Sequence, residues 1–69
     1  MAKTKHVVGG EEKEFEAIFD PNNGYWVECG SEKFLARDRG QAQRWLVRHG
    51  LPSRPAKDLL FLAKQETSS

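Results

Sequence analysis

Among the residue types of this sequence, arginine has the clearest potential to bind a ligand, because a guanidinium group contacts phosphates and base edges through paired hydrogen bonds. The chain carries 11 Lys and Arg against 10 Asp and Glu, a formal net charge of +1 at pH 7. This near balance hides a division along the chain. Residues 1–32 hold three lysines against seven acids, a charge of −4, whereas residues 33–64 hold eight cations against two acids, a charge of +6. The second half is therefore the candidate surface for an anionic partner.

The cations of the second half gather at the end of one predicted strand, on the outer side of a predicted helix and in the loop after it. If DNA or RNA is the partner, phosphate and base contacts are expected from this region. The predicted contact residues are Arg37, Arg39, Gln41, Arg44, Arg48, Arg54 and Lys57. The alternative interpretation is a solvated surface whose charges are segregated without function.

Catalytic chemistry has little support in the residue pattern. The two histidines, the single Cys29 and the scattered carboxylates show no nucleophile and base at a recognisable spacing. Gly9-Gly10 lacks the lysine and helix that follow in a phosphate-binding loop. Cys29 has no partner for a disulfide and no zinc-ligand spacing around it. We therefore expect no enzyme, no cofactor, no metal and no small-molecule substrate.

Size and apolar patterning indicate one folded domain. Sixty-nine residues, of which 38% are hydrophobic and 30% charged, suit a single small core. No apolar run is long enough to span a membrane, and the first residues lack the apolar region of a signal peptide. A cytoplasmic protein without membrane contact is the expectation.

Three strands are predicted from alternation and turn chemistry. Residues 1–13 show no clear period and are expected to form a flexible arm or a short edge strand. Strict alternation begins at Glu14, and the turn residues from Asp20 to Gly24 predict a hairpin with a three-residue loop at 22–24. Gly30-Ser31 then makes a two-residue hairpin loop.

These two loops predict the strand register. The second loop places Cys29 opposite Glu32, and counting outward places Trp26 opposite Leu35. The first loop, counted in the same way, places Phe19 opposite Val27. One sheet face then forms the predicted core, made of Phe15, Ala17, Phe19, Tyr25, Val27, Cys29, Phe34 and Ala36.

A helix over residues 38–49 follows from its end signals. Asp38 caps its start with Gln41 three residues on, and Gly50 stands where a helix ends. Residues 56–66 contain helix formers, yet their apolar run also suits a buried fourth strand. The predicted fold is α+β: a three-stranded antiparallel β-meander packed on an α-helix, with a C-terminal helix or fourth strand. Residues 14–66 form this β-β-β-α-α domain, and residues 67–69 form a frayed tail.

The opposite sheet face offers a second kind of site. Ile18, Trp26 and Leu35 are neighbours in the predicted register, and Glu28 and Lys33 lie beside them. An apolar patch with a charged rim is typical of a protein-binding site, so the alternative function is an inhibitor or adaptor that binds a host protein. If residues 56–66 cover this face, the three residues are a second small core instead. A free sheet edge permits either a monomer or a homodimer.

Several residues resemble a known DNA-binding family. Asn22-Asn23-Gly24-Tyr25, Phe34, and Arg37-Asp38-Arg39 leading into a helix with Ala42 are similar to the arm-type DNA-binding domain of lambda-type tyrosine recombinases. The resemblance implies a three-stranded sheet with a helix on one face, and a sheet that lies in the major groove of DNA. Four carboxylates on the predicted outer face would be repelled by phosphates, so we expect contact through the helix side. The hypothesis is a small nucleic-acid-binding accessory protein of the kind that phages and mobile elements encode.

Overall fold

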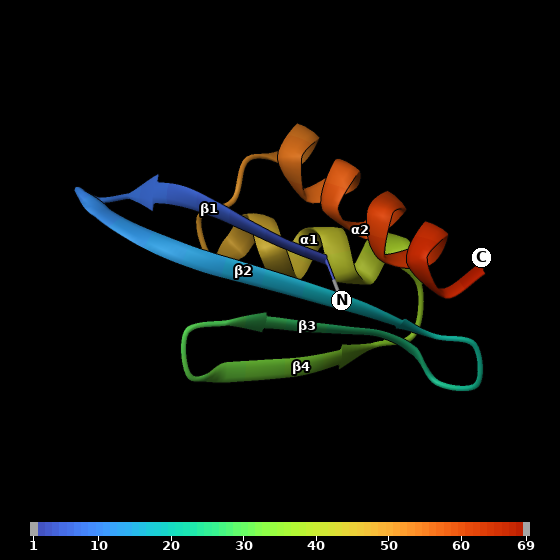
Figure 1. The fold of residues 1–69 in the computed structure, drawn as a ribbon. Helices are drawn as coiled ribbons and strands as arrows, with labels where there is room; N and C mark the ends of the chain where they lie inside the picture. Colours follow the sequence, from blue (N-terminus) through green and yellow to red (C-terminus); the bar gives the residue numbers. More distant parts are fainter. Residues whose placement is uncertain (1, 69) are drawn as a thin grey trace.

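A computed structural model of the protein describes residues 2–68, without the side chain of Ser68. Over these residues one antiparallel sheet has four strands in sequence order, β1 (Ala2–Val8), β2 (Glu11–Asp20), β3 (Gly24–Cys29) and β4 (Glu32–Ala36). Two helices, α1 (Arg39–Arg48) and α2 (Ser53–Ser68), follow the sheet and lie on one side of it (Figure 1). The α+β class is confirmed. The expectations for Met1 and Ser69 concern positions outside the described residues.

The strand that the prediction lacked is β1. The sequence predicted that its residues form either a flexible arm or a short edge strand. β1 pairs with β2 along its whole length, from Ala2 opposite Ala17 to Val8 opposite Glu11. Gly9 and Gly10 connect the two strands with positive φ angles of 59° and 85°, which L side chains rarely adopt. β2 accordingly begins at Glu11 and not at residue 14. The prediction of a three-stranded sheet was one strand short because polar Thr4 and His6 occupy inward positions of β1, so residues 2–8 show no apolar alternation.

The register predicted for the first hairpin was wrong by two residues. In the structure Asp20 pairs with Gly24, and Val27 lies opposite Ala17 and not opposite Phe19. The Asp20 carboxylate accepts hydrogen bonds from the Asn23 side-chain amide at 2.8 Å and from the Asn22 N–H at 2.9 Å. These hydrogen bonds start the turn at Asp20, and they lower the pKa of the Asp20 carboxyl. A shift of two residues leaves every side chain on its predicted face.

The second hairpin and the core face agree with the sequence. Cys29 pairs with Glu32, and Trp26 pairs with Leu35. Gly30 takes the positive φ of 62° that this turn requires. Phe15, Ala17, Tyr25, Val27, Cys29 and Ala36 are buried, and Phe19 and Phe34 pack partly buried against them. The prediction for this face is confirmed.

Helix α1 begins with the predicted cap. The Asp38 carboxylate accepts a hydrogen bond from the Gln41 N–H at 2.8 Å, and the Gln41 side-chain oxygen accepts one from the Arg37 N–H at 2.8 Å. This reciprocal pair satisfies backbone donors that the first helical turn leaves without partners. His49 forms the C-cap, so the prediction of a helix over residues 38–49 is confirmed.

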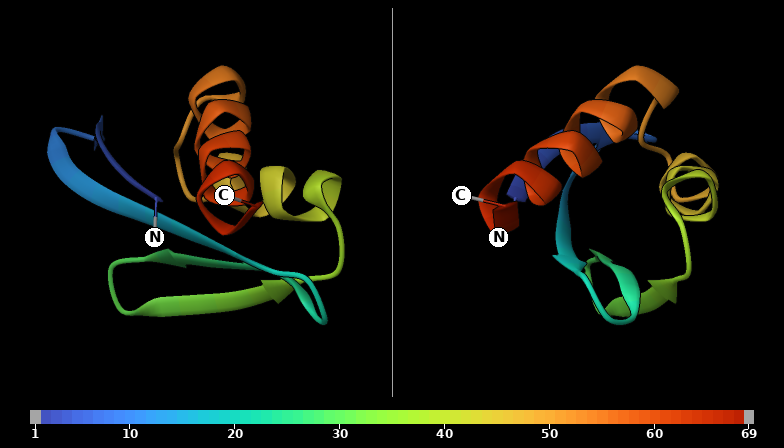
Figure 2. Two further views of the ribbon diagram at one scale, coloured as in Figure 1. Left: turned by 45° about the vertical axis from the view of Figure 1, so that its right-hand side comes forward. Right: turned by 90° about the vertical axis from the view of Figure 1, so that its right-hand side faces the viewer.

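Helix α2 resolves the alternative between a helix and a fourth strand in favour of the helix. Its buried residues, Ala56, Leu59, Leu60 and Ala63, recur at the spacing of one helical face. α2 packs on β1 and β2, α1 packs on β3 and β4, and the helices pack on each other. Figure 2 shows both helices on the same side of the sheet. Within residues 2–68 neither helix is long and apolar enough to cross a membrane.

Candidate functional site

The two-layer fold gives the molecule two broad surfaces, the outer side of the helices and the uncovered face of the sheet. We call these the helix side and the open sheet face. The residues predicted for nucleic-acid binding lie on or beside the helices. Most are exposed, namely Arg37, Arg39, Arg44, Arg48, Arg54 and Lys57. Gln41 is half-buried, and its side-chain oxygen accepts a hydrogen bond from the Arg37 N–H.

Besides Gln41, Arg44 and Arg48 are the predicted residues that line a concave site. They are four positions apart and therefore share one side of α1. A hollow of about 280 Å³ lies beside them. We call it the aromatic cleft, and it is lined by Phe34, Gln41, Arg44, Trp45 and Arg48. Arg37, Arg39, Arg54 and Lys57 lie outside this cleft.

The aromatic side chains of the cleft, Phe34 and Trp45, were not among the site residues predicted from the sequence, which placed Phe34 in the core. Both are half-buried at the margin of the core, because β4 is an edge strand and Trp45 lies on the flank of α1. Their ring planes are parallel to within 5°, with centroids 6.0 Å apart. The available signal was the position of Trp45 directly after Arg44 and three residues before Arg48.

His49 extends the aromatic cluster toward the second hairpin loop. Its ring centroid lies 3.9 Å from that of Trp45, and its Nδ1 atom lies 3.1 Å from a Glu32 carboxylate oxygen. The imidazole is mostly shielded, with 25% of its side chain exposed, whereas 65% of the Glu32 side chain is exposed. These contacts anchor the end of α1 to β4. They hold Trp45 in place on one side.

Lysines of the sheet contact carboxylates, whereas the arginines of the helix side contact none among the described residues. In the part of the chain that the structure describes, ion pairs join Lys3 to Glu16, Lys5 to Glu12 and Lys33 to Glu28, and the His49 imidazole contacts the Glu32 carboxylate. None of these pairs includes an arginine. Because an arginine stays charged at any ordinary pH, Arg44 and Arg48 present full positive charge beside the aromatic cleft.

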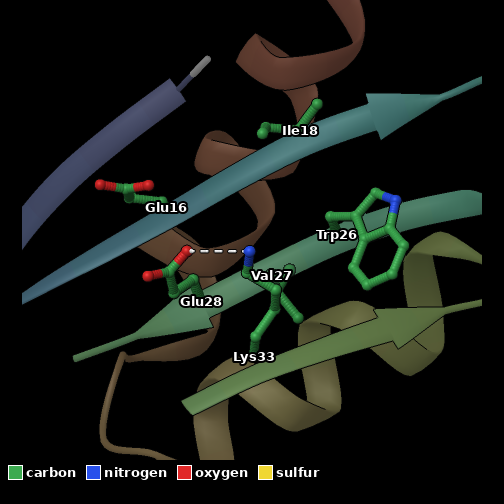
Figure 3. A pocket seen from close by; sticks show the side chains of 6 residues that line it. All are labelled: Glu16, Ile18, Trp26, Val27, Glu28 and Lys33. Atoms are coloured by element: carbon green, nitrogen blue, oxygen red, sulfur yellow. Dashed lines mark ion pairs between the residues drawn. The ribbon is translucent and has the colours of Figure 1, made fainter. Parts of the chain in front are cut away.

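The open sheet face carries the second predicted site. Trp26 is 36% exposed and Ile18 is 41% exposed, and a hollow of about 280 Å³ lies over them. Figure 3 shows its lining residues, which come from three strands: Glu16, Ile18, Trp26, Val27, Glu28 and Lys33. Leu35 is half-buried and pairs with Trp26 but does not line the hollow. No other element of residues 2–68 packs on this face, so here the three apolar residues are a surface patch and not a second core.

The charge of the open sheet face is negative overall. Alternation along the paired strands places five acids outward, namely Glu12, Glu14, Glu16, Asp20 and Glu28. The same alternation places three lysines outward, namely Lys3, Lys5 and Lys33. The face therefore carries a formal charge of −2. Two of the three lysines, Lys3 and Lys5, lie on β1. The predicted three-stranded sheet lacked this strand and therefore did not include them.

A comparison with protein-family models, curated proteins and solved structures finds no match for this chain. Over residues 2–68 no three His, Cys, Asp or Glu side chains lie together in a way that could hold a metal ion. Cys29 is buried under the sheet, and this burial raises the pKa of its thiol. The reactive form of Cys29 is thereby disfavoured. The candidate sites thus consist of charged and aromatic surface groups.

Proposed function

We propose that the protein is a small non-enzymatic nucleic-acid-binding accessory protein that contacts phosphates through the arginines of the helix side. The observation that carries this proposal is the pairing of Arg44 and Arg48, which form no ion pair with a carboxylate of the described chain, with the aromatic cleft beside them. Binding to phosphates releases the counterions of the nucleic acid, and this release supplies much of the affinity. Exposed arginines on a helix suit such contacts.

The proposal uses the helix side because the open sheet face carries five acids against three lysines. A net charge of −2 opposes the approach of phosphates. The resemblance to the arm-type domains of tyrosine recombinases supports DNA as a partner. In that family the sheet lies in the groove, so our proposal places the contact on the other layer of the fold.

A salt-dependent binding titration tests the proposal. Fluorescence anisotropy of labelled duplex and single-stranded oligonucleotides is measured from roughly 50 to 200 mM salt. Over this range counterion release changes the affinity of a phosphate-binding protein strongly. We expect the affinity to fall steeply with salt. The double substitution Arg44→Glu and Arg48→Glu is expected to weaken binding at least about tenfold and to reduce the salt slope by about 2.

The matched control reverses two cations on the open sheet face, Lys3→Glu and Lys5→Glu. This variant has the same net charge as the arginine variant, so a general charge effect would weaken both equally. We expect the lysine variant to keep most of its affinity. Absence of binding at about 50 mM salt, or equal losses in the two variants, would contradict the proposal.

A second candidate function is protein binding through the Trp26 patch. It is favoured by the hollow over Ile18 and Trp26 and by the position of both helices on the opposite face. The net charge of the face indicates a partner segment that presents an apolar side chain among basic residues. The partner is sought by affinity capture after nuclease treatment, and its binding is then measured with purified protein. Trp26→Ala should abolish this binding and the arginine variant should keep it; the opposite result would exclude this function.

A further inference from the structure

The aromatic cleft indicates which form of nucleic acid fits the helix side. We infer that the cleft takes an unpaired base, so that the protein binds single-stranded DNA or RNA in preference to a duplex. This inference rests on the proposed function, since it takes Arg44 and Arg48 as the phosphate contacts. It adds a role for Phe34 and Trp45, which phosphate contacts alone do not require.

The geometry of the cleft suits a flat aromatic ligand. The rings of Phe34 and Trp45 stack on each other, parallel to within 5° with centroids 6.0 Å apart, so a planar base enters from the solvent side of this pair and not between the two rings. The hollow beside them measures about 280 Å³ and is open to solvent between α1 and β4. Base stacking on aromatic side chains is a general source of affinity for single strands and depends little on base identity.

The polar groups around the rings match the rest of a nucleotide. Arg44 and Arg48 are one helical turn apart at the border of the cleft, where their guanidinium groups can contact phosphates or stack on a base. The Gln41 side-chain oxygen is engaged by the Arg37 N–H at 2.8 Å. The amide NH₂ group of Gln41 is therefore the part that can donate a hydrogen bond to a base acceptor.

A duplex makes poor use of this site. The faces of its bases are covered by their stacked neighbours, and only base edges are reachable in the grooves. Phe34 and Trp45 are half-buried, whereas the arginines are exposed. A duplex that contacts the arginines therefore leaves the aromatic rings without a base to stack on. An unpaired base pays no unpairing cost and can enter the cleft.

The chain provides its own optical probe, because one of its two tryptophans, Trp26, lines the hollow on the open sheet face and the other, Trp45, lines the aromatic cleft. The variant Trp26→Phe keeps Trp45 as its single tryptophan, and Trp45→Phe keeps Trp26. Both are titrated with an unlabelled thymidine oligonucleotide, with an abasic oligonucleotide of the same length, and with a hairpin duplex that has the same number of phosphates. Circular dichroism first establishes that each variant is folded.

We expect the thymidine strand to quench the fluorescence of Trp45 but not that of Trp26, and to bind about tenfold more tightly than the duplex. The abasic strand is expected to bind like the duplex, because it keeps the phosphates and lacks the bases. Phe34→Leu should reduce the affinity for the thymidine strand and leave duplex binding unchanged. If this variant does not fold, the abasic comparison carries the same information.

The outcomes separate the inference from the proposed function. Equal affinity for thymidine strand, abasic strand and duplex, without quenching of Trp45, would overturn the inference and leave nucleic-acid binding intact. Quenching of Trp26 in place of Trp45 would overturn it as well, because the open sheet face would then be the binding surface. Absence of binding to all three ligands would overturn both.

Discussion

The helix side and the open sheet face enclose the same core, yet they present opposite chemistry to solvent. The helix side carries exposed arginines next to half-buried aromatic rings. The open sheet face carries an apolar patch surrounded by carboxylates and lysines. The division of charge along the chain thus becomes a division between the two layers of the fold. It does so because the outward positions of β2 are acidic and the outward side of α1 is basic.

The two surfaces also differ in how far their charges are balanced locally. Lysines of the open sheet face lie 3.5 to 4.0 Å from glutamate oxygens of neighbouring strands. Such exposed pairs contribute only about 0–1 kcal/mol to stability, but they reduce the field that the face presents to a partner. The arginines of the helix side lack comparable partners among the described residues. The positive charge without a nearby carboxylate therefore lies on the helix side, the surface for which we propose nucleic-acid contacts.

The largest expected contrast between the two surfaces is in stability. Leu60 is fully buried between α2 and the sheet, and Leu60→Ala should lower the free energy of unfolding by about 3 kcal/mol through lost burial and a cavity. Trp26 is partly exposed on the uncovered face, and Trp26→Ala should cost only about 1 kcal/mol. Urea denaturation followed by circular dichroism measures both. An equal loss would mean that the Trp26 patch is covered by another part of the protein.

A smaller effect is expected at the cap that orients the helix side. Asp38→Ala removes the acceptor for the Gln41 N–H and should lower the free energy of unfolding by about 1 kcal/mol. Asp58→Ala is the matched control, because it removes an exposed aspartate from the interior of α2 and should change stability by less than about 0.5 kcal/mol. Thermal unfolding compares the two. Equal values would show that the cap does not stabilise α1.

The smallest change in stability is expected from the ionisation of Cys29, which points from the sheet into the core. Burial raises the pKa of its thiol, so at mildly alkaline pH the folded protein should react with a thiol reagent far more slowly than the urea-unfolded chain. The raised pKa also means that stability falls as the pH rises above the ordinary thiol pKa, because only the unfolded chain then loses the proton. Similar rates in the folded and unfolded states would contradict the burial of Cys29.

Sequence reasoning worked best where short-range chemistry decides the structure. Gly30-Ser31 defines the register of β3 and β4, and Asp38 with Gln41 defines the start of α1, so both were predicted correctly. The first hairpin shows the limit of this approach. Its turn residues allow two loop positions, and the choice depends on the hydrogen bonds of one carboxylate, that of Asp20.

The sequence by itself determined the faces of β2, β3 and β4, the bounds of α1 and the separation of acidic from basic residues. These properties depend on alternation and capping, which act within a few residues. Only the tertiary structure decided that residues 2–8 extend the sheet, that α2 lies beside α1, and that Phe34 and Trp45 border a cleft with Arg44 and Arg48. These properties depend on contacts between distant parts of the chain. The local pattern of an amphipathic segment indicates that one side is buried, but it does not indicate which other element of the fold covers that side.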